Sequence, residues 1–149
     1  MTDPNNVIII SASCGKNLEL SQKFHEKNIE LKINSEILDL TSFNIPLFNP
    51  RIHSKENIPV EIIEIKEKLF AIEKWIICAP EYNGSIPPIL SNLIAWLSVS
   101  GDDFRNLFNG QPIAIATFSG GVGLELLTSL RIQLVHLGSQ VLGLSLIHI

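Results

Sequence analysis

Short apolar runs alternate with segments of helical periodicity along the chain, and this alternation limits the fold more than any other feature. The runs have strand length and are rich in β-branched residues, whereas the segments between them space apolar residues three and four positions apart. The predicted strands cover residues 7–10, 36–40, 75–79, 112–117 and 140–147. The predicted helices cover residues 17–30, 59–72 and 87–98, and a fourth is marked by Leu127, Leu130, Leu134 and Leu137. Strict alternation of strand and helix predicts an α/β fold, in which an open parallel sheet carries helices on both faces.

Length, charge and cysteine content exclude several classes of protein. A chain of 149 residues predicts a single domain over 1–149. The formal net charge is −4 and no Lys/Arg cluster interrupts it, so we do not expect nucleic acid as a partner. No segment has the length of a membrane span, and the N-terminus lacks a signal-peptide pattern, so we expect no membrane partner. Neither the two cysteines nor the histidines have metal-ligand spacing, which predicts no metal site, reduced thiols and a cytoplasmic location.

The segment 80–87, here called the second loop, follows directly on the predicted strand 75–79. Its Pro, Asn and Gly residues end the strand and predict an irregular connection to the helix of 87–98. In open α/β sheets, the loops at the carboxyl ends of strands hold ligands. For these residue types alone, a purely structural turn is an equally good interpretation.

The second loop and the helix behind it resemble the NADPH-dependent FMN reductase family, which includes flavodoxin-like quinone, azo-dye and chromate reductases. The resemblance rests on Pro-Glu-Tyr-Asn-Gly-Ser-x-Pro at 80–87, followed by Leu90, Asn92, Trp96 and Leu97. Ser91 and Ala95 stand where the family usually has Lys and Asp. The resemblance implies a flavodoxin-like sheet of five strands in the order 2-1-3-4-5. This order would bring the loops after strands one, three and four to one crevice.

The same resemblance implies an oxidoreductase that binds FMN and uses NADPH or NADH as electron donor. Hydride would pass from the nicotinamide to the flavin, and electrons would then pass to a small-molecule acceptor such as a quinone, an azo compound, a flavin or a metal oxyanion. Because the cofactor carries this chemistry, no side chain is expected to be catalytic. The family's pattern assigns the second loop to the flavin through Pro80, Glu81, Tyr82 and Asn83.

Residues 11–17, the first loop, offer hydroxyl groups, a glycine and the start of a helix. Free N–H groups and the positive end of the helix dipole favour a phosphate at such a place. From this segment alone, helix capping by Ser13 or Asn17 is the simpler interpretation. The family holds the FMN phosphate here, so the resemblance assigns the phosphate to Ser11, Ser13, Lys16 and Asn17, with Lys16 in place of the usual Arg.

Residues 117–123, the third loop, match the family's Ser-Gly-Gly-x-Gly segment. Glycine lets a backbone approach a planar ligand because no Cβ stands in the way. A simple helix-start turn would also explain this composition. With the resemblance, we expect the flavin to contact Ser119, Gly120 and Gly121.

The segment 46–50 resembles a Pro-Leu-aromatic stretch that the family has near the flavin and the substrate entrance. Arg51 and His53 follow it and offer positive charge for an anionic substrate or for the 2′-phosphate of NADPH, although solvated loop charges are the simpler interpretation.

Two other classes of function stay open at this point: a flavodoxin-type FMN electron carrier, and a copy of the fold that binds a partner without flavin. The resemblance also implies a homodimer or homotetramer, with residues 84–87 and the following helix at the contact. The chain stops at Ile149, where the family continues into a last helix, so we expect a truncated C-terminus.

Overall fold

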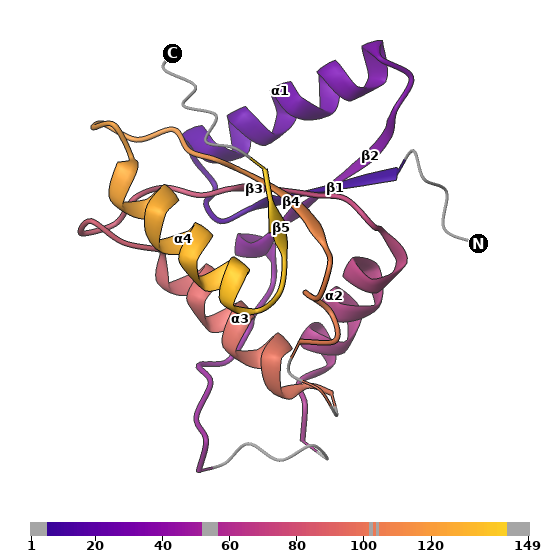
Figure 1. Ribbon diagram of the computed structural model, residues 1–149, viewed down its shortest axis with the longest axis vertical. Helices are drawn as coiled ribbons and strands as arrows, with labels where there is room; N and C mark the ends of the chain where they lie inside the picture. The colour runs from indigo at the N-terminus through magenta and orange to yellow at the C-terminus, as the bar shows by residue number, and fades with distance from the viewer. Residues whose placement is uncertain (1–5, 52–56, 102, 104, 143–149) are drawn as a thin grey trace.

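The computed structural model describes residues 6–51, 57–101, 103 and 105–142, and its centre is a parallel sheet of five strands (Figure 1). The strand order is β2-β1-β3-β4-β5, and all four pairings are parallel. The strands are β1 (Asn6–Ser11), β2 (Asn34–Asp39), β3 (Trp75–Cys78), β4 (Pro112–Ala116) and β5 (Gln140–Val141). The predicted flavodoxin-like order is therefore confirmed.

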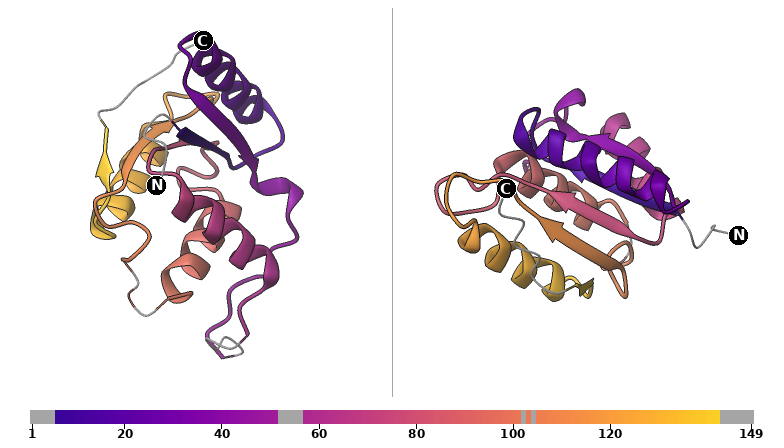
Figure 2. Two further views of the ribbon diagram at one scale, coloured as in Figure 1. Left: turned by 90° about the vertical axis from the view of Figure 1, so that its right-hand side faces the viewer. Right: turned by 90° about the horizontal axis from the view of Figure 1, so that it is seen from above.

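The described helices cover the two faces of the sheet unequally. They are α1 (Lys16–Glu30), α2 (Val60–Ala71), α3 (Pro88–Val99) and α4 (Leu124–His136), with a short 3-10 turn η1 (Leu40–Ser42) after β2. Helix α1 lies on one face, whereas α2, α3 and α4 lie on the other (Figures 1 and 2). Helices on both faces were predicted, and this is confirmed.

Alternating side chains of the central strands supply both cores. On β1, Ile8 and Ile10 belong to the larger core with α2, α3 and α4, whereas Val7 and Ile9 belong to the smaller core under α1. Strand β3 divides in the same way, with Ile77 in the larger core and Cys78 in the smaller. Successive side chains of a strand point to opposite faces, so a strand covered on both sides is apolar throughout.

Prolines set the starts of two helices one residue later than predicted. Helix α2 begins at Val60 with Pro59 as its N-cap, and α3 begins at Pro88 with Pro87 as its N-cap. Proline fits there because the first turn of a helix needs no N–H donor and the ring fixes φ near the helical value.

The structure describes the predicted last strand only at its start. Strand β5 covers Gln140–Val141, and the guanidinium of Arg131 on α4 donates to the carbonyls of Val141 and Leu142 at 3.2 and 2.5 Å. The rest of the predicted strand, residues 143–147, lies outside the described residues. Among the helices that the structure describes, none is both long and apolar enough to cross a bilayer.

Candidate functional site

The first, second and third loops leave the sheet side by side at one edge. Ser11 is in register with Cys78, and Cys78 with Ala116, so β1, β3 and β4 end at the same level. Backbone hydrogen bonds continue the pairing past the strands, from the Ala12 N–H to the Cys78 carbonyl (2.9 Å) and from the Ala79 N–H to the Ala116 carbonyl (3.1 Å). The carboxyl edge of the central strands is where open α/β sheets hold ligands.

The first loop ends in a helix start that no side chain caps. Gly15 is the N-cap of α1 and makes no side-chain cap hydrogen bond, so neither Ser13 nor Asn17 performs the capping considered from the sequence. Ser11 is buried, and its hydroxyl donates to the Ser13 carbonyl at 2.8 Å. The backbone N–H groups of Lys16 and Asn17 have no partner among the described residues. Unpaired N–H groups at the positive end of a 15-residue helix are suited to an anion.

Two side chains at the start of α1 are already engaged. The exposed ammonium of Lys16 pairs with the Glu19 carboxylate at 2.8 Å, an ion pair that an incoming anion can displace because surface pairs are weak. The Asn17 side chain is 2% exposed; its Nδ2 donates to the Phe118 carbonyl at 3.0 Å and its Oδ1 accepts from the Phe118 N–H at 2.8 Å. From position 17, the backbone N–H is therefore the group that remains for a phosphate.

The second loop contains a tight hairpin turn that the sequence analysis described only as irregular. Tyr82 and Ser85 exchange two backbone hydrogen bonds, at 3.1 and 3.0 Å. Between them Asn83 has φ +52° and Gly84 has φ +67°. Positive φ at both central residues is the type I′ geometry that Asn-Gly prefers. Pro80, before the turn, is buried, whereas Tyr82, at the start of the turn, is half exposed.

Glu81 fastens the second loop to the third. Its N–H donates to the Ser119 hydroxyl at 3.2 Å, and its carboxylate accepts from the Leu126 N–H in the first turn of α4 at 3.3 Å. The Ser119 hydroxyl in turn lies 2.8 Å from that of Thr117. A carboxylate at a helix N-terminus is favourable for the helix dipole. Glu81 thus has a structural role in joining these two loops.

The glycines of the third loop differ in what surrounds them. A Cβ on Gly120 or Gly121 would meet nothing within 4 Å, so their backbone is open on the side where a side chain would stand. Gly123, the N-cap of α4, has φ +68°, and a Cβ there would lie 2.5 Å from the Thr117 Cγ2. The loop therefore combines an exposed backbone with one glycine that the fold itself requires.

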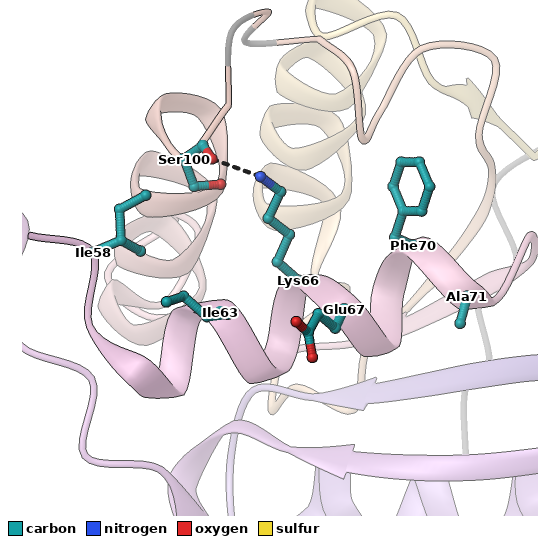
Figure 3. Close-up of a pocket in the computed structure, with 7 residues that line it drawn as sticks. All are labelled: Ile58, Ile63, Lys66, Glu67, Phe70, Ala71 and Ser100. Atoms are coloured by element: carbon teal, nitrogen blue, oxygen red, sulfur yellow. Dashed lines mark hydrogen bonds between the residues drawn. The ribbon is translucent and has the colours of Figure 1, made fainter. Parts of the chain in front are cut away.

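A hollow of about 500 Å³ lies against the second loop. It is lined by Glu81, Tyr82, Asn83, Ser85, Ile86 and Pro88. A second hollow, of about 470 Å³, lies along α2 and none of the predicted site residues lines it (Figure 3). Its walls are mostly apolar, and its Lys66 ammonium points away from α2 to donate to the Ser100 carbonyl at 2.6 Å. The first hollow is the candidate site for the ring; the second loop and the start of α3 line it, and the described residues of the first and third loops do not.

Asn92 and Trp96 of α3, which belong to the pattern of family resemblance, hold the segment 46–48 against the helix. The Asn92 amide accepts from the Phe48 N–H at 2.8 Å and donates to the Pro46 carbonyl at 3.0 Å. Trp96 donates its indole N–H to the same carbonyl at 2.8 Å, and its ring lies edge-on to that of Phe48. Asn92 and Trp96 are four residues apart, and this i, i+4 spacing was the sequence signal that both lie on the same face of the helix.

Arg51 and His53 were considered for an anionic substrate or the 2′-phosphate of NADPH. Arg51 is exposed and its N–H donates to the Asn49 side chain at 3.0 Å. His53 lies outside the described residues.

The two cysteines lie in different environments. Cys14 is exposed in the first loop, whereas Cys78 is buried at the end of β3. Burial raises the pKa of Cys78 to about 11, although the hydrogen bond with Ser21 acts in the opposite direction.

The sequence model of the NADPH-dependent FMN reductase family matches residues 5–148. The chain belongs to this family. A quinone reductase of Escherichia coli K12 is 34% identical over 102 residues, which make up 67% of this chain and 53% of the relative. An NAD(P)H-dependent FMN reductase of Pseudomonas aeruginosa is 30% identical over 86 residues, 58% of this chain and 43% of the relative. The chain thus spans about half the length of the curated relatives it matches.

Solved structures agree on the fold. A flavoenzyme NAD(P)H:(acceptor) oxidoreductase from Paracoccus denitrificans superimposes with a TM-score of 0.78 at 21% identity, over 93% of this chain and 75% of that one. An azoreductase from Bacillus anthracis gives 0.66 at 13% identity, over 91% and 83%. A flavodoxin from an archaeon gives 0.65 at 10% identity, over 93% and 79%. At such identities the likeness concerns the fold alone.

Proposed function

We propose that this protein is an NAD(P)H-dependent oxidoreductase that holds FMN at the edge formed by the three loops. Its electrons would go to a small-molecule acceptor of the quinone, azo, flavin or metal-oxyanion class. The observation that carries the proposal is the meeting of the first, second and third loops at one sheet edge, with unpaired N–H groups on the first and open glycine backbone on the third. Family membership and the names of the curated relatives support the same conclusion.

The residues at this edge fit the two chemically different ends of FMN. Around the N-terminus of α1, the backbone N–H groups of Lys16 and Asn17, the Lys16 ammonium and the hydroxyl-bearing Ser11 and Ser13 would hold the phosphate. The isoalloxazine ring would lie against Pro80, Glu81, Tyr82, Asn83, Ser119, Gly120 and Gly121. A hollow of about 500 Å³ is within the usual range of cofactor sites.

The chain itself supplies position and polarity. When bound, FMN supplies hydride and electron transfer between NAD(P)H and an acceptor. Backbone N–H groups of the second and third loops would orient the ring and stabilise negative charge at its polar edge, because fixed donors need no rearrangement when charge develops. The Glu81–Ser119 and Asn17–Phe118 hydrogen bonds hold those donors in place.

The test is spectroscopic and then kinetic. Protein purified without added flavin, or reconstituted with FMN, should show the visible absorption bands of bound flavin, and it should oxidise NADPH or NADH in the presence of a quinone or azo dye. A protein that binds no flavin would contradict the proposal and support a binding-partner role. Bound FMN that NAD(P)H reduces only slowly would support an electron carrier.

We further propose a cytoplasmic homodimer or homotetramer, with residues 84–87 and α3 at the subunit contact. The turn at Asn83 and Gly84 is exposed in the single chain and is therefore available for a contact. The exposed free thiol of Cys14 supports a reducing compartment. Analytical ultracentrifugation that finds an active monomer would contradict the assembly.

A further inference from the structure

Asn17 joins two loops that are far apart along the chain. Its amide forms two hydrogen bonds with the peptide groups of Phe118, donating to the carbonyl at 3.0 Å and accepting from the N–H at 2.8 Å, across a separation of 101 residues. The side chain is 2% exposed. Two opposed hydrogen bonds fix both the distance and the orientation of the loop that receives them, as neighbouring strands fix one another.

No other hydrogen bond between residues 12–17 and residues 117–123 occurs in the part of the chain that the structure describes. The second loop has its own connection to the third, through Glu81 and Ser119. The hydrogen bonds that connect the third loop to the helix start of α1 therefore come from a single side chain, and the packing of Phe118 on the smaller core beside Leu20 adds to them. Phe118 immediately precedes Ser119, Gly120 and Gly121, the segment with open backbone.

We infer that Asn17 is a positioning residue for the flavin ring, acting through Phe118 on residues 119–121 rather than through its amide on the phosphate. The inference rests on the proposed function. Removing the amide would leave the N–H and carbonyl of Phe118 without their partner, and the third loop would have to be ordered when the ring binds. Ordering a loop on binding weakens affinity.

Two flavins separate this role from that of a phosphate ligand. FMN carries the phosphate and riboflavin lacks it, while the ring is the same. We expect Asn17→Ala to lower the affinity for FMN and the affinity for riboflavin by the same factor, about tenfold, because a hydrogen bond that orders the third loop is lost. The matched control is Lys16→Ala, one residue away, which should lower the affinity for FMN and leave the affinity for riboflavin unchanged. Both affinities are measured by titration of flavin fluorescence.

A second readout distinguishes positioning from a general effect on folding. Asn17→Ala should move the visible absorption bands and the midpoint potential of the bound flavin, because the donors around the ring change place. A residue that supports only the fold would lower the thermal midpoint and leave the bands and potential of the remaining bound flavin unchanged.

The unsubstituted protein provides a test that needs no variant. The Phe118 N–H should be protected from hydrogen exchange in the apo protein, whereas the N–H groups of Gly120 and Gly121 should exchange quickly. Rapid exchange at Phe118 would overturn the inference, and so would loss of FMN affinity in Asn17→Ala with riboflavin affinity unchanged. If the unsubstituted protein binds neither flavin, the proposed function fails first, and this result is distinct from failure of the Asn17 inference.

Discussion

The two thiols of this chain lie in opposite environments. Cys14 is exposed in the first loop, while Cys78 is buried beneath α1, where the absence of water disfavours the thiolate and raises the pKa to about 11. Reaction of a cysteine requires the thiolate and access to it. At pH 8 we expect a thiol reagent to label the native apo protein once and the denatured protein twice. Cys14→Ser should abolish the native labelling; two rapid labels in the native state would contradict the burial of Cys78.

The same pKa predicts how stability depends on pH. In the unfolded chain Cys78 ionises near pH 9, whereas in the folded protein it ionises near pH 11. Between these values the folded state holds the proton and the unfolded state does not, so the free energy of unfolding falls as pH rises. We expect a total loss that approaches about 2–3 kcal/mol above pH 11, of which roughly 1.5–2 kcal/mol falls between pH 8.5 and 10.5. Denaturant unfolding at pH 8.5 and 10.5 measures it, and Cys78→Ala should show a smaller loss over the same interval.

Two glycines of the third loop form a matched pair. Gly123 has φ +68°, and a Cβ would collide with Thr117, whereas a Cβ on Gly120 would meet open space. An L-residue with left-handed backbone costs about 1–2 kcal/mol. We therefore expect Gly123→Ala to lower the free energy of unfolding by at least that amount.

Gly120→Ala is the control. It should change the stability of the apo protein by no more than about 0.5 kcal/mol, the usual effect of a surface substitution. In the proposed function, however, the added methyl group stands where the ring approaches, so Gly120→Ala should weaken FMN binding. If Gly120→Ala destabilises the apo protein as much as Gly123→Ala, the third loop has a different conformation from the one described.

Helix α3 holds the segment 46–48 through Asn92 and Trp96, and this contact can be tested by proteolysis. Asn92→Ala removes two of the hydrogen bonds that tie this segment to the helix. Exposed Arg51 nearby offers a trypsin site, and cleavage rates follow the free energy of local opening. We expect cleavage after Arg51 to become several-fold faster, since each hydrogen bond contributes about 1 kcal/mol. Ser91→Ala, on the same helix, should leave the rate unchanged.

Secondary structure was largely predictable because the apolar patterns of strands and of helices both involve residues that are close together in the sequence. Ile8 and Ile10 alternate with Val7 and Ile9 because β1 is buried on both sides. The predicted helix starts at Pro59 and Pro87 are one residue too early, since propensity does not reveal whether a proline is the N-cap or the first residue of the helix. Arg131 of α4 donates to the carbonyls of Val141 and Leu142, and no local pattern carries such a contact between elements.

The candidate site was predictable as a set of loops but not as a set of contacts. The glycines and prolines of the second and third loops are local signals, and the structure places both at the carboxyl edge of the central strands. The partner of Asn17 lies 101 residues away, so its side chain could not be assigned from sequence. The Asn83–Gly84 turn had a local signal, the Asn-Gly pair, that the prediction of an irregular loop did not use.

Ligand binding and global stability are linked if FMN binds the folded chain alone. FMN at about 100 times its dissociation constant should add about 2.7 kcal/mol to the free energy of unfolding. For a domain of this size each kcal/mol raises the thermal midpoint by about 2–4 °C, so we expect a rise of roughly 5–10 °C. Differential scanning fluorimetry with FMN, and with adenosine monophosphate as a phosphate control, measures the shift. No shift with FMN would contradict specific binding.

The Asn17–Phe118 contact also bears on the order in which the chain folds. Contacts between distant segments form late, because closing a long loop costs conformational entropy before the contact contributes. Helix α1 can pack on β1 and β2 from local sequence, but the third loop exists only once β4 has joined β3. The crevice should therefore be among the last features to appear during synthesis and refolding. FMN would then capture completed molecules and would not accelerate the formation of their early structure.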